Sequence, residues 1–216
     1  MLWRQHSLKI HKLGSQLFIG IDDGYFPLHF KSMKGSTALV GVISNSNMEV
    51  IKILVDKVTV DGLDASSKAI ELISRACSEV EGSELVVFLD GVTYAGFNIV
   101  DPTKLYTITG FPVITLFWRP LDLKRILRAL SEHFNDWRYR YSVIASVYSM
   151  SKPITTPRGV LRASCYGISI DKAKRVIRLL QLYHPYPYPL RLADIVASAI
   201  SRYWIKAVMK TIDDER

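Results

Sequence analysis

The chain has 216 residues, of which 49% are hydrophobic and 22% charged, a composition typical of a globular protein with a substantial core. Its formal net charge of +8 at pH 7 favours a polyanionic partner. No apolar run approaches the ~18 residues that cross a bilayer, and residues 1–14 are basic without the apolar stretch of a secretory signal. We expect one domain over residues 1–216, a cytoplasmic location, no membrane association, and a monomer or homodimer.

The cysteines and the basic residues further limit the kinds of protein that the sequence could encode. Cys77 and Cys165 lie far apart and show no Cys-x-x-Cys or Cys/His spacing, which indicates reduced thiols and no structural zinc. Basic residues gather in several runs, which suit nucleic acid, although solvated helix faces also explain such runs. These runs are residues 9–12, 31–34, 119–128, 138–140 and 172–178.

The first third of the chain predicts an antiparallel meander. Strands are expected at residues 17–22, 37–44 and 49–60, because the connections between them are too short for crossover helices. A helix with an apolar stripe then follows to residue 80, capped by Ser66 or Ser67.

The middle of the chain predicts a parallel unit. Residues 85–89 and 112–118 form continuous apolar runs, as expected of buried strands. Between them, Asp101 and Pro102 suit the start of a short helix. A strand, helix and strand in this order imply parallel strands joined by a crossover.

The last part is mainly helical. Asp122 is expected to cap a helix to residue 134, and Asp171 begins another to residue 182. The proline-rich stretch 183–189 predicts an extended connector. The other expected elements are a helix at 138–150, a strand at 160–168 and a final helix at 190–209. The apolar stripe of that helix (Leu192, Ile195, Val196, Ala199, Ile200 and Tyr203) favours packing on the sheet over binding at a membrane surface.

The order of these elements predicts the fold class. An antiparallel meander, then parallel units, then helices is typical of an α/β, ribonuclease H-like mixed sheet flanked by helices, rather than a plain doubly wound sheet. The chain has no G-x-G-x-x-G after a strand and no Walker A loop, which leaves dinucleotide and P-loop functions without support.

Acidic residues follow three of the strands. Asp22 and Asp23 end the first, Asp61 and Asp64 follow the third, and Asp90 ends the strand at 85–89. Carboxylates at strand ends suit a divalent metal such as Mg²⁺, although Asp-Gly is also ordinary turn chemistry. We favour Asp22 over Asp23, because neighbouring strand residues point to opposite faces. On a basic protein, the pattern suggests metal-assisted cleavage of a phosphodiester.

Candidate substrate contacts lie near these strand ends. Tyr94 and Phe97 suit stacking on a base, Gly96 permits close backbone approach, and Asn98 suits a hydrogen bond to a base. Phe97 is equally well explained as a core residue. Tyr25 carries the same two interpretations. Lys34 and Arg119 suit phosphate contacts, and Arg191 suits a phosphate or a pair with a site carboxylate, although a solvated or structurally paired cation explains each of them equally well. His184 is a weaker candidate for a general base, since it has no partner at catalytic spacing.

Four segments together resemble the largely archaeal family called endonuclease dU, which is related to endonuclease V. They are Gly-Ile-Asp-Asp-Gly-Tyr-Phe at 20–26, Val-Asp-Gly-Leu-Asp-Ala-Ser at 60–66, the run from Leu89 to Asp101, and Pro-Leu-Arg-Leu-Ala-Asp-Ile-Val-Ala at 189–197. The resemblance implies a ribonuclease H-like fold. It also implies a Mg²⁺- or Mn²⁺-dependent enzyme that nicks DNA, or RNA, near a deaminated base such as deoxyuridine or deoxyinosine.

The resemblance also implies roles for single residues. Asp22 matches the first-strand metal carboxylate, and Asp90 matches the Asp of the relatives' Asp-Gly-Gln-Gly strand end. Asp64 falls near the catalytic Glu, with Asp61 as the alternative, and Asp194 matches the acidic or histidine position of the final helix. We therefore predict Asp22, Asp64, Asp90 and Asp194 as catalytic residues, the first three of them as metal ligands.

The chain departs from endonuclease V in two places. It has no Pro-Tyr-x-Pro before Asp64, and residues 91–98 replace the Gly-x-x-His-Pro-Arg stretch, so the base preference does not carry over. The main alternative is a non-catalytic nucleic-acid-binding module of the same fold. An actin–hexokinase-type phosphotransferase needs two such domains, and a haloacid dehalogenase-like phosphatase needs Asp at position 24, which is Gly24.

Overall fold

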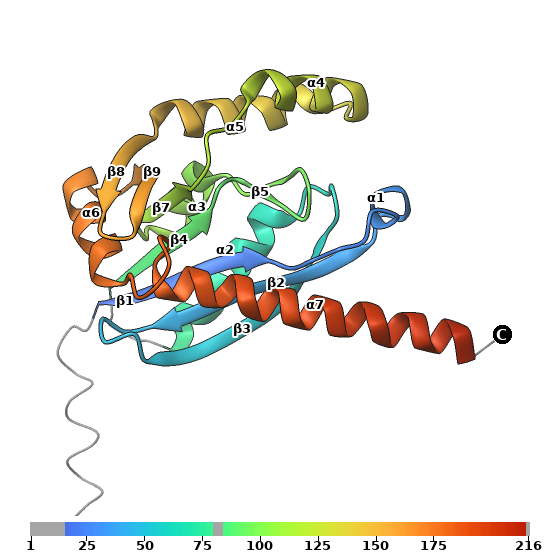
Figure 1. Ribbon diagram of the computed structural model, residues 1–216, viewed down its shortest axis with the longest axis horizontal. Helices are drawn as coiled ribbons and strands as arrows, with labels where there is room; N and C mark the ends of the chain where they lie inside the picture. The colour runs from blue at the N-terminus through green and yellow to red at the C-terminus, as the bar shows by residue number, and fades with distance from the viewer. Residues whose placement is uncertain (1–15, 80–83, 215–216) are drawn as a thin grey trace, which may run out of the picture.

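A seven-stranded mixed sheet forms the centre of the computed structural model, which describes residues 16–79 and 84–214 (Figure 1). The strand order is β3-β2-β1-β4-β7-β9-β8. Its strands are β1 (Leu17–Asp23), β2 (Ser36–Ser44), β3 (Val50–Thr59), β4 (Leu85–Asp90), β7 (Val113–Phe117), β8 (Lys152–Thr156) and β9 (Gly159–Tyr166). A separate short hairpin consists of β5 (Thr93–Tyr94) and β6 (Asn98–Ile99).

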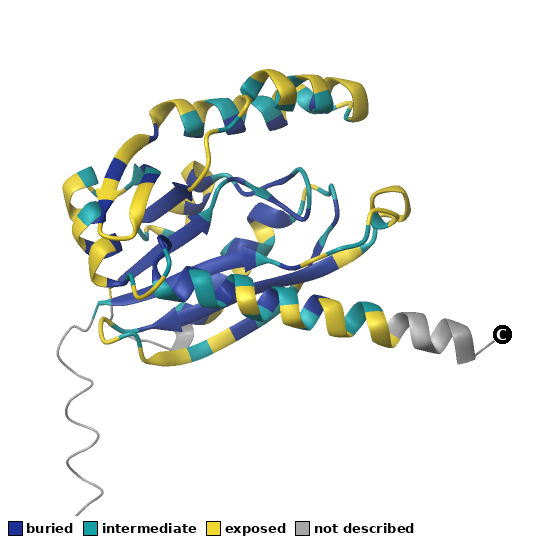
Figure 2. Ribbon diagram, in the orientation of Figure 1, coloured by how far each residue is buried: buried dark blue, intermediate teal, exposed yellow. Residues whose placement is uncertain are grey.

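Helices cover both faces of this sheet. They are α1 (Phe30–Met33), α2 (Ala65–Glu79), α3 (Pro102–Thr109), α4 (Leu123–His133), α5 (Trp137–Met150), α6 (Ile170–Leu179) and α7 (Tyr188–Asp214). Buried side chains of α2 and α3 share one core with the sheet, and those of α6 and the start of α7 pack on its other face. The α4–α5 pair lies as a separate layer and packs near Phe117 at the end of β7 (Figures 1 and 2).

The strand directions confirm the predicted fold class. β1 pairs antiparallel with β2 and β2 antiparallel with β3, whereas β1, β4 and β7 run parallel. β7 then pairs antiparallel with β9, which forms a hairpin with β8. The N-terminal meander and the parallel unit are therefore as the sequence predicts, and the β8–β9 hairpin completes a ribonuclease H-like sheet.

Several predicted boundaries are wrong by a few residues. Helix α2 begins at Ala65, before the expected caps, because the side chain of Ser66 is buried and donates to the carbonyl of Ile99. Helix α6 ends at Leu179, earlier than expected, and α7 begins inside the proline-rich connector at Tyr188. The predicted end of α2 at residue 80 and the basic run at residues 9–12 lie outside the described residues.

The buried face of α7 matches the predicted stripe only in part. The helix packs on the sheet, as expected, but the side chains it buries there are Leu190, Ala193, Ala197 and Ser201, whereas Tyr203 is 73% exposed. Small residues form the closest contact because the helix lies very close to the strands, while Leu192, Val196 and Ile200 of the predicted stripe pack, partly buried, against the same cluster. Hydrophobic periodicity therefore finds one side of the contact and misses its small-residue centre. In the described part of the chain, no helix is long and apolar enough to span a membrane.

Gly20 in β1 and Gly24, directly after the strand, explain how close α7 lies. A Cβ on Gly20 would collide with the backbone of Pro189 and Leu190, and one on Gly24 would collide with Ala197 and Ser201. Since backbone atoms cannot move aside as a flexible side chain can, a larger residue at position 20 must displace the helix. This contact fixes the start of α7 against β1.

We expect Gly20→Ala to destabilise the protein by roughly 3 kcal/mol, because the new methyl group meets helix backbone. Gly41→Ala on the neighbouring strand is a matched control, since its Cβ would lie 3.1 Å from the flexible end of Ile19. Thermal unfolding of both variants measures the difference. Equal Tm values would contradict the proposed packing of α7 on Gly20.

Candidate active site at the carboxyl ends of the parallel strands

Two aspartates lie side by side at the ends of β1 and β4. Ile21 pairs with Leu89 in the parallel register, so the next residues, Asp22 and Asp90, end adjacent strands on the same face of the sheet. This is the face on which α7 packs, since it also contains Gly20. The carboxyl ends of apolar strands therefore place two acidic groups together, as the sequence predicts.

Helix α7 supplies a third carboxylate. Leu190 packs on Gly20 and Ala197 packs near Gly24, so Asp194 lies between these contacts, beside Asp22. Asp194 lines the same cavity as Asp22 and Asp90 and forms an ion pair with Arg191 one turn earlier. A residue more than 100 positions away in sequence is therefore brought to the site by the close packing of the helix.

Asp23 points to the opposite face of β1 but still lines the cavity. Its side chain accepts a hydrogen bond from the backbone N–H of Ala95 at 2.8 Å. Asp22 accepts one at 2.9 Å from the N–H of Asp23. The structure thus gathers Asp22, Asp23, Asp90 and Asp194 at one cavity.

Tyr186 fixes the orientation of Asp90, a contact that the sequence did not reveal. Its hydroxyl donates to Asp90 Oδ1 at 2.5 Å and accepts from the backbone N–H of Trp118 at 3.2 Å. The rings of Trp118, His184 and Tyr186 meet edge to face, with centroids 4.5–5.9 Å apart. Residue pattern could not locate Tyr186, because an extended connector has no periodicity that sets where a side chain points.

Burial and mutual repulsion raise the pKa of each buried carboxyl. Desolvation is the largest cause for Asp22, whose pKa lies well above its usual value, and the charges of Asp90, Asp23 and Asp194 add to it. Desolvation likewise raises the pKa of Asp23 to about 7 and that of Asp90 to about 6, although the Tyr186 hydroxyl lowers the latter. The cluster therefore carries negative charge that water solvates poorly.

The donor set suits a hard divalent cation. Mg²⁺ and Mn²⁺ prefer carboxylate oxygens, and a cation would relieve the repulsion that raises the pKa values of Asp22 and Asp90. Within residues 16–79 and 84–214, no three His, Cys, Asp or Glu side chains are already arranged as a cation site. The carboxylates suit a divalent cation by their chemistry and charge, and their side chains must rotate toward one another to share it.

The cavity beside the carboxylates has a volume of about 530 Å³ and two unlike halves. The polar half contains the four aspartates with Arg191, His184 and Tyr186. The other half is apolar, and the α4–α5 pair contributes Ile126 and Ile144 to its lining. Its remaining apolar lining comes from Val92, Phe97, Phe117 and Leu121.

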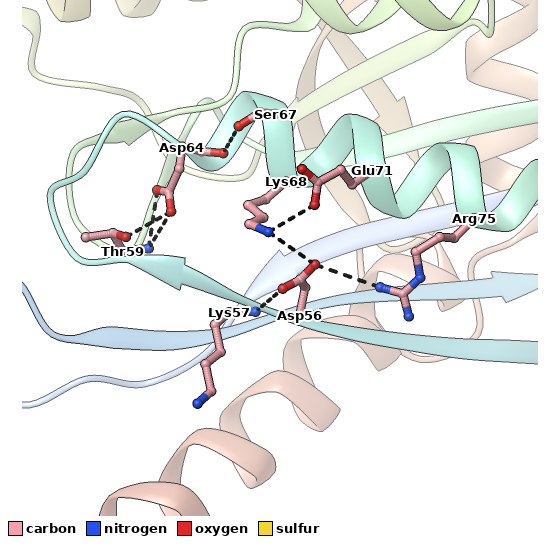
Figure 3. Close-up of polar contacts among 8 residues, drawn as sticks. All are labelled: Asp56, Lys57, Thr59, Asp64, Ser67, Lys68, Glu71 and Arg75. Carbon is pink, nitrogen blue, oxygen red and sulfur yellow. Dashed lines mark hydrogen bonds and ion pairs between the residues drawn. The ribbon is translucent and has the colours of Figure 1, made fainter.

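Asp64, a predicted metal ligand, does not join this cluster. It accepts a hydrogen bond from the Thr59 hydroxyl at 2.8 Å (Figure 3). It also accepts one from the Asn98 amide at 2.5 Å and lines a second cavity. The alternative, Asp61, lines the same second cavity, where it accepts from the N–H of Phe97 and pairs with Lys31. Strand β2 lies between β3 and β1, so the loop that carries both residues follows a strand that does not adjoin β1, and neither residue lines the first cavity.

A family model described as endonuclease dU matches residues 16–201, most of the chain. The chain belongs to the endonuclease dU family. Archaeal relatives agree in length and sequence. The UPF0215 protein of Thermococcus gammatolerans is 38% identical over 182 residues, which cover 84% of this chain and 90% of the relative. That of Pyrococcus horikoshii is 37% identical with the same coverage of both chains.

Solved structures confirm the fold of this endonuclease dU family member. A protein of unknown function from Archaeoglobus fulgidus superposes with a TM-score of 0.70 at 26% identity, over 86% of this chain and 98% of its own. Human ENDOV gives 0.56 at 17% identity, over 90% and 86%. Ciona intestinalis endonuclease V, solved with a 23mer DNA containing an inosine, gives 0.58 at 13%, over 90% and 87%. The endonuclease V fold is therefore shared, and family and fold together support a nuclease of this type.

Two predicted base contacts are buried in this endonuclease dU chain. The ring of Tyr94 is fully buried, and its hydroxyl donates to the carbonyl of Ile21, so it ties β1 to the β5 hairpin and offers no face to a base. Asn98 is also fully buried and bonds to Ala65, Thr59 and Asp64. Both side chains hold the loops around the site, and the prediction that they contact a base is wrong.

The other predicted contacts are spread over the surface. Phe97 lines both cavities, and Gly96 adopts a positive φ of 90° where a Cβ would collide with Asp61. Arg119 and Arg191 line the first cavity and Lys34 the second. Tyr25 lies outside both and stacks under Arg202, with 5.0 Å between the guanidinium carbon and the ring centroid.

We expect the metal-free protein to lose stability as pH rises. Because the folded pKa of Asp90 is about 6 and that of Asp23 about 7, the native state keeps protons that the unfolded chain releases near pH 4. Stability therefore falls between about pH 4 and 7 and stays low above it. Thermal unfolding of the parent and of Asp90→Asn, both with a chelator, checks this. The Tm of Asp90→Asn minus the Tm of the parent should increase by at least ~3 °C between pH 5 and pH 8. A pH-independent difference would contradict the raised pKa.

Proposed function

We propose that the protein is a Mg²⁺- or Mn²⁺-dependent endonuclease that nicks DNA at a deaminated base, deoxyuridine or deoxyinosine. The observation that carries the proposal is the convergence of Asp22, Asp90 and Asp194 beside a cavity, in a member of the endonuclease dU family. Carboxylates from three separate elements meet there although their repulsion is unfavourable, which is typical of a functional site.

The same carboxylates explain the expected cofactor. Asp22 and Asp90 would hold the cation and Asp194 would complete or orient its shell, with Asp23 behind them. Asp64 is left out of this set, since Thr59 and Asn98 engage its side chain. A bound divalent cation would supply Lewis acidity and an activated water at neutral pH.

The chain's own groups position the substrate in this proposal. Arg119 is exposed at the cavity mouth and suits a phosphate, and Arg191 holds Asp194 in place. The apolar half of the cavity, with Phe97 and Phe117, suits a base taken out of the stack. A volume of about 530 Å³ provides room for a nucleoside beside the carboxylates.

A nicking assay tests the activity directly. End-labelled duplexes with one deoxyuridine, one deoxyinosine or no lesion are incubated with protein and Mg²⁺ or Mn²⁺. We expect a nick beside one lesion and a rate at least ~100-fold lower for Asp90→Ala, since that change removes a proposed ligand. Asp64→Asn is the matched control and should retain most activity.

Each failure of this assay has a distinct meaning. A nick that survives unchanged in Asp90→Ala would overturn the assigned site. Salt-sensitive binding without a nick would favour a nucleic-acid-binding module over an enzyme. Cleavage of the RNA counterpart alone would show that the substrate is RNA and not DNA.

Tyr186 is expected to act as a positioning residue for Asp90. Tyr186→Phe removes the hydroxyl that orients Oδ1, so the Mn²⁺ concentration for half-maximal nicking should rise roughly 10-fold, with most of the rate restored at saturating Mn²⁺. Tyr183→Phe is the control, since that side chain belongs to the same connector and is 64% exposed. An unchanged Mn²⁺ requirement in Tyr186→Phe would contradict this role.

A further inference from the structure

Positive charge is concentrated in one part of the chain. Residues 151–187 contain seven Lys and Arg residues and a single acid, Asp171, which gives this segment a local net charge of +6. The whole chain has a net charge of +8, so most of the excess comes from β8, β9, α6 and the connector to α7. These elements lie together at one end of the molecule (Figure 1).

Four exposed cations form what we call the α6 basic surface: Arg158, Lys172, Arg175 and Arg178. Arg158 lies in the turn between β8 and β9, and the other three lie on α6. Arg178 donates to the carbonyl of Thr155 at 2.7 Å, which fixes the end of α6 against this hairpin. Figure 2 shows that much of α6 faces solvent.

The cations of this surface lack acidic partners. Elsewhere, Lys31, Lys68 and Arg128 each lie within 4 Å of a carboxylate. Among the described residues, none of the four cations on the α6 basic surface forms an ion pair, although Arg178 has its backbone contact. Unpaired surface cations in such number are repelled by one another and are available to a polyanion.

The α6 basic surface adjoins the candidate active site. β9 pairs with β7 so that Arg162 lies opposite Phe117, which places Arg158 past the carboxyl end of β7, the edge where the aspartates gather. The connector after α6 bridges the two regions. Gln181 contacts Thr156 of the hairpin at 3.1 Å, and Tyr186 contacts Asp90.

We infer that the α6 basic surface binds the phosphate backbone of a duplex flank that extends beyond the cleaved position. This inference rests on the proposed function, because it assumes that a nucleic acid occupies the neighbouring cavity. Helix α6 is about 15 Å long, which corresponds to roughly four or five base pairs at 3.4 Å per step. The surface therefore reads no base and adds affinity on one side of the lesion.

A triple variant that removes three positive charges, Arg158→Gln with Lys172→Gln and Arg175→Gln, tests the inference. These side chains make no hydrogen bond or ion pair in the described part of the chain, so the fold should be kept, as circular dichroism would confirm. The control neutralises Lys104, Lys124 and Lys206, which are exposed on α3, α4 and α7. It removes the same charge from other surfaces.

Binding is measured on lesion duplexes with long flanks across a series of salt concentrations, and nicking on a duplex trimmed on each side in turn. We expect the triple variant to bind the long duplex roughly 10- to 100-fold more weakly near 0.1 M salt. The slope of log K against log salt should fall by about 2 to 3, while the control changes little. Trimming one flank of the duplex should weaken its binding to the parent protein by a similar factor. The parent and the triple variant should then nick that trimmed duplex at equal rates.

The two hypotheses fail in different ways. An affinity and salt slope that match those of the control variant would overturn the α6 basic surface, even if lesion nicking is observed. Absence of nicking by the parent, together with a reduced slope in the triple variant, would overturn the proposed enzyme and keep the surface.

Discussion

Repulsion among buried carboxylates is the constraint on which the rest of the site depends. Asp22 is only 8% exposed, and Asp90, Asp23 and Asp194 all raise its pKa. Backbone pairing of β1 with β4 fixes two of these groups, and the contact of α7 with Gly20 fixes Asp194. The rest of the fold must hold these groups together against their charge, and the Tyr94 hydroxyl, which joins Ile21 to Asp90, is one such tie.

Charge is distributed so that an acidic centre lies within a basic protein. Acidic residues alone would repel a polyanion, so a nucleic acid can approach this edge only if cations neutralise the centre and surround it. Arg119 and Arg191 lie at the cavity itself, and the α6 basic surface begins beyond it. In the proposed function, the aspartates therefore carry the chemistry, and the neighbouring cations carry the affinity for the phosphate backbone.

Sequence could predict what depends on local pattern. Apolar runs that end in Asp22 and Asp90 identify parallel strands and their shared edge, and the fold class follows from the order of the elements. Asp64 shows the limit: it also follows a strand, but β2 separates that strand from β1, and Thr59 and Asn98 bind its carboxylate. Strand order and side-chain capture are properties of the tertiary structure, which one sequence does not specify.

The centre of the α7 contact and the role of Tyr186 could not be predicted, for related reasons. Hydrophobicity identifies Leu192, Val196 and Ile200, which do pack on the sheet, but not the closest contacts of α7, which small residues make because Gly20 and Gly24 admit the helix at short range. Tyr186 lies in an irregular connector whose course is set by contacts with Trp118 and Asp90. Such contacts become visible only when distant segments are placed together.

Proton release on Mn²⁺ binding is the most direct test of the central claim, that raised-pKa carboxylates form a cation site. Calorimetric titration near pH 6.5, in two buffers of different ionisation enthalpy, counts the protons displaced. The carboxylate cluster predicts saturable Mn²⁺ binding that releases roughly one proton or more and is lost in Asp90→Asn. Mn²⁺ binding that releases no proton, or that persists in Asp90→Asn, would contradict it.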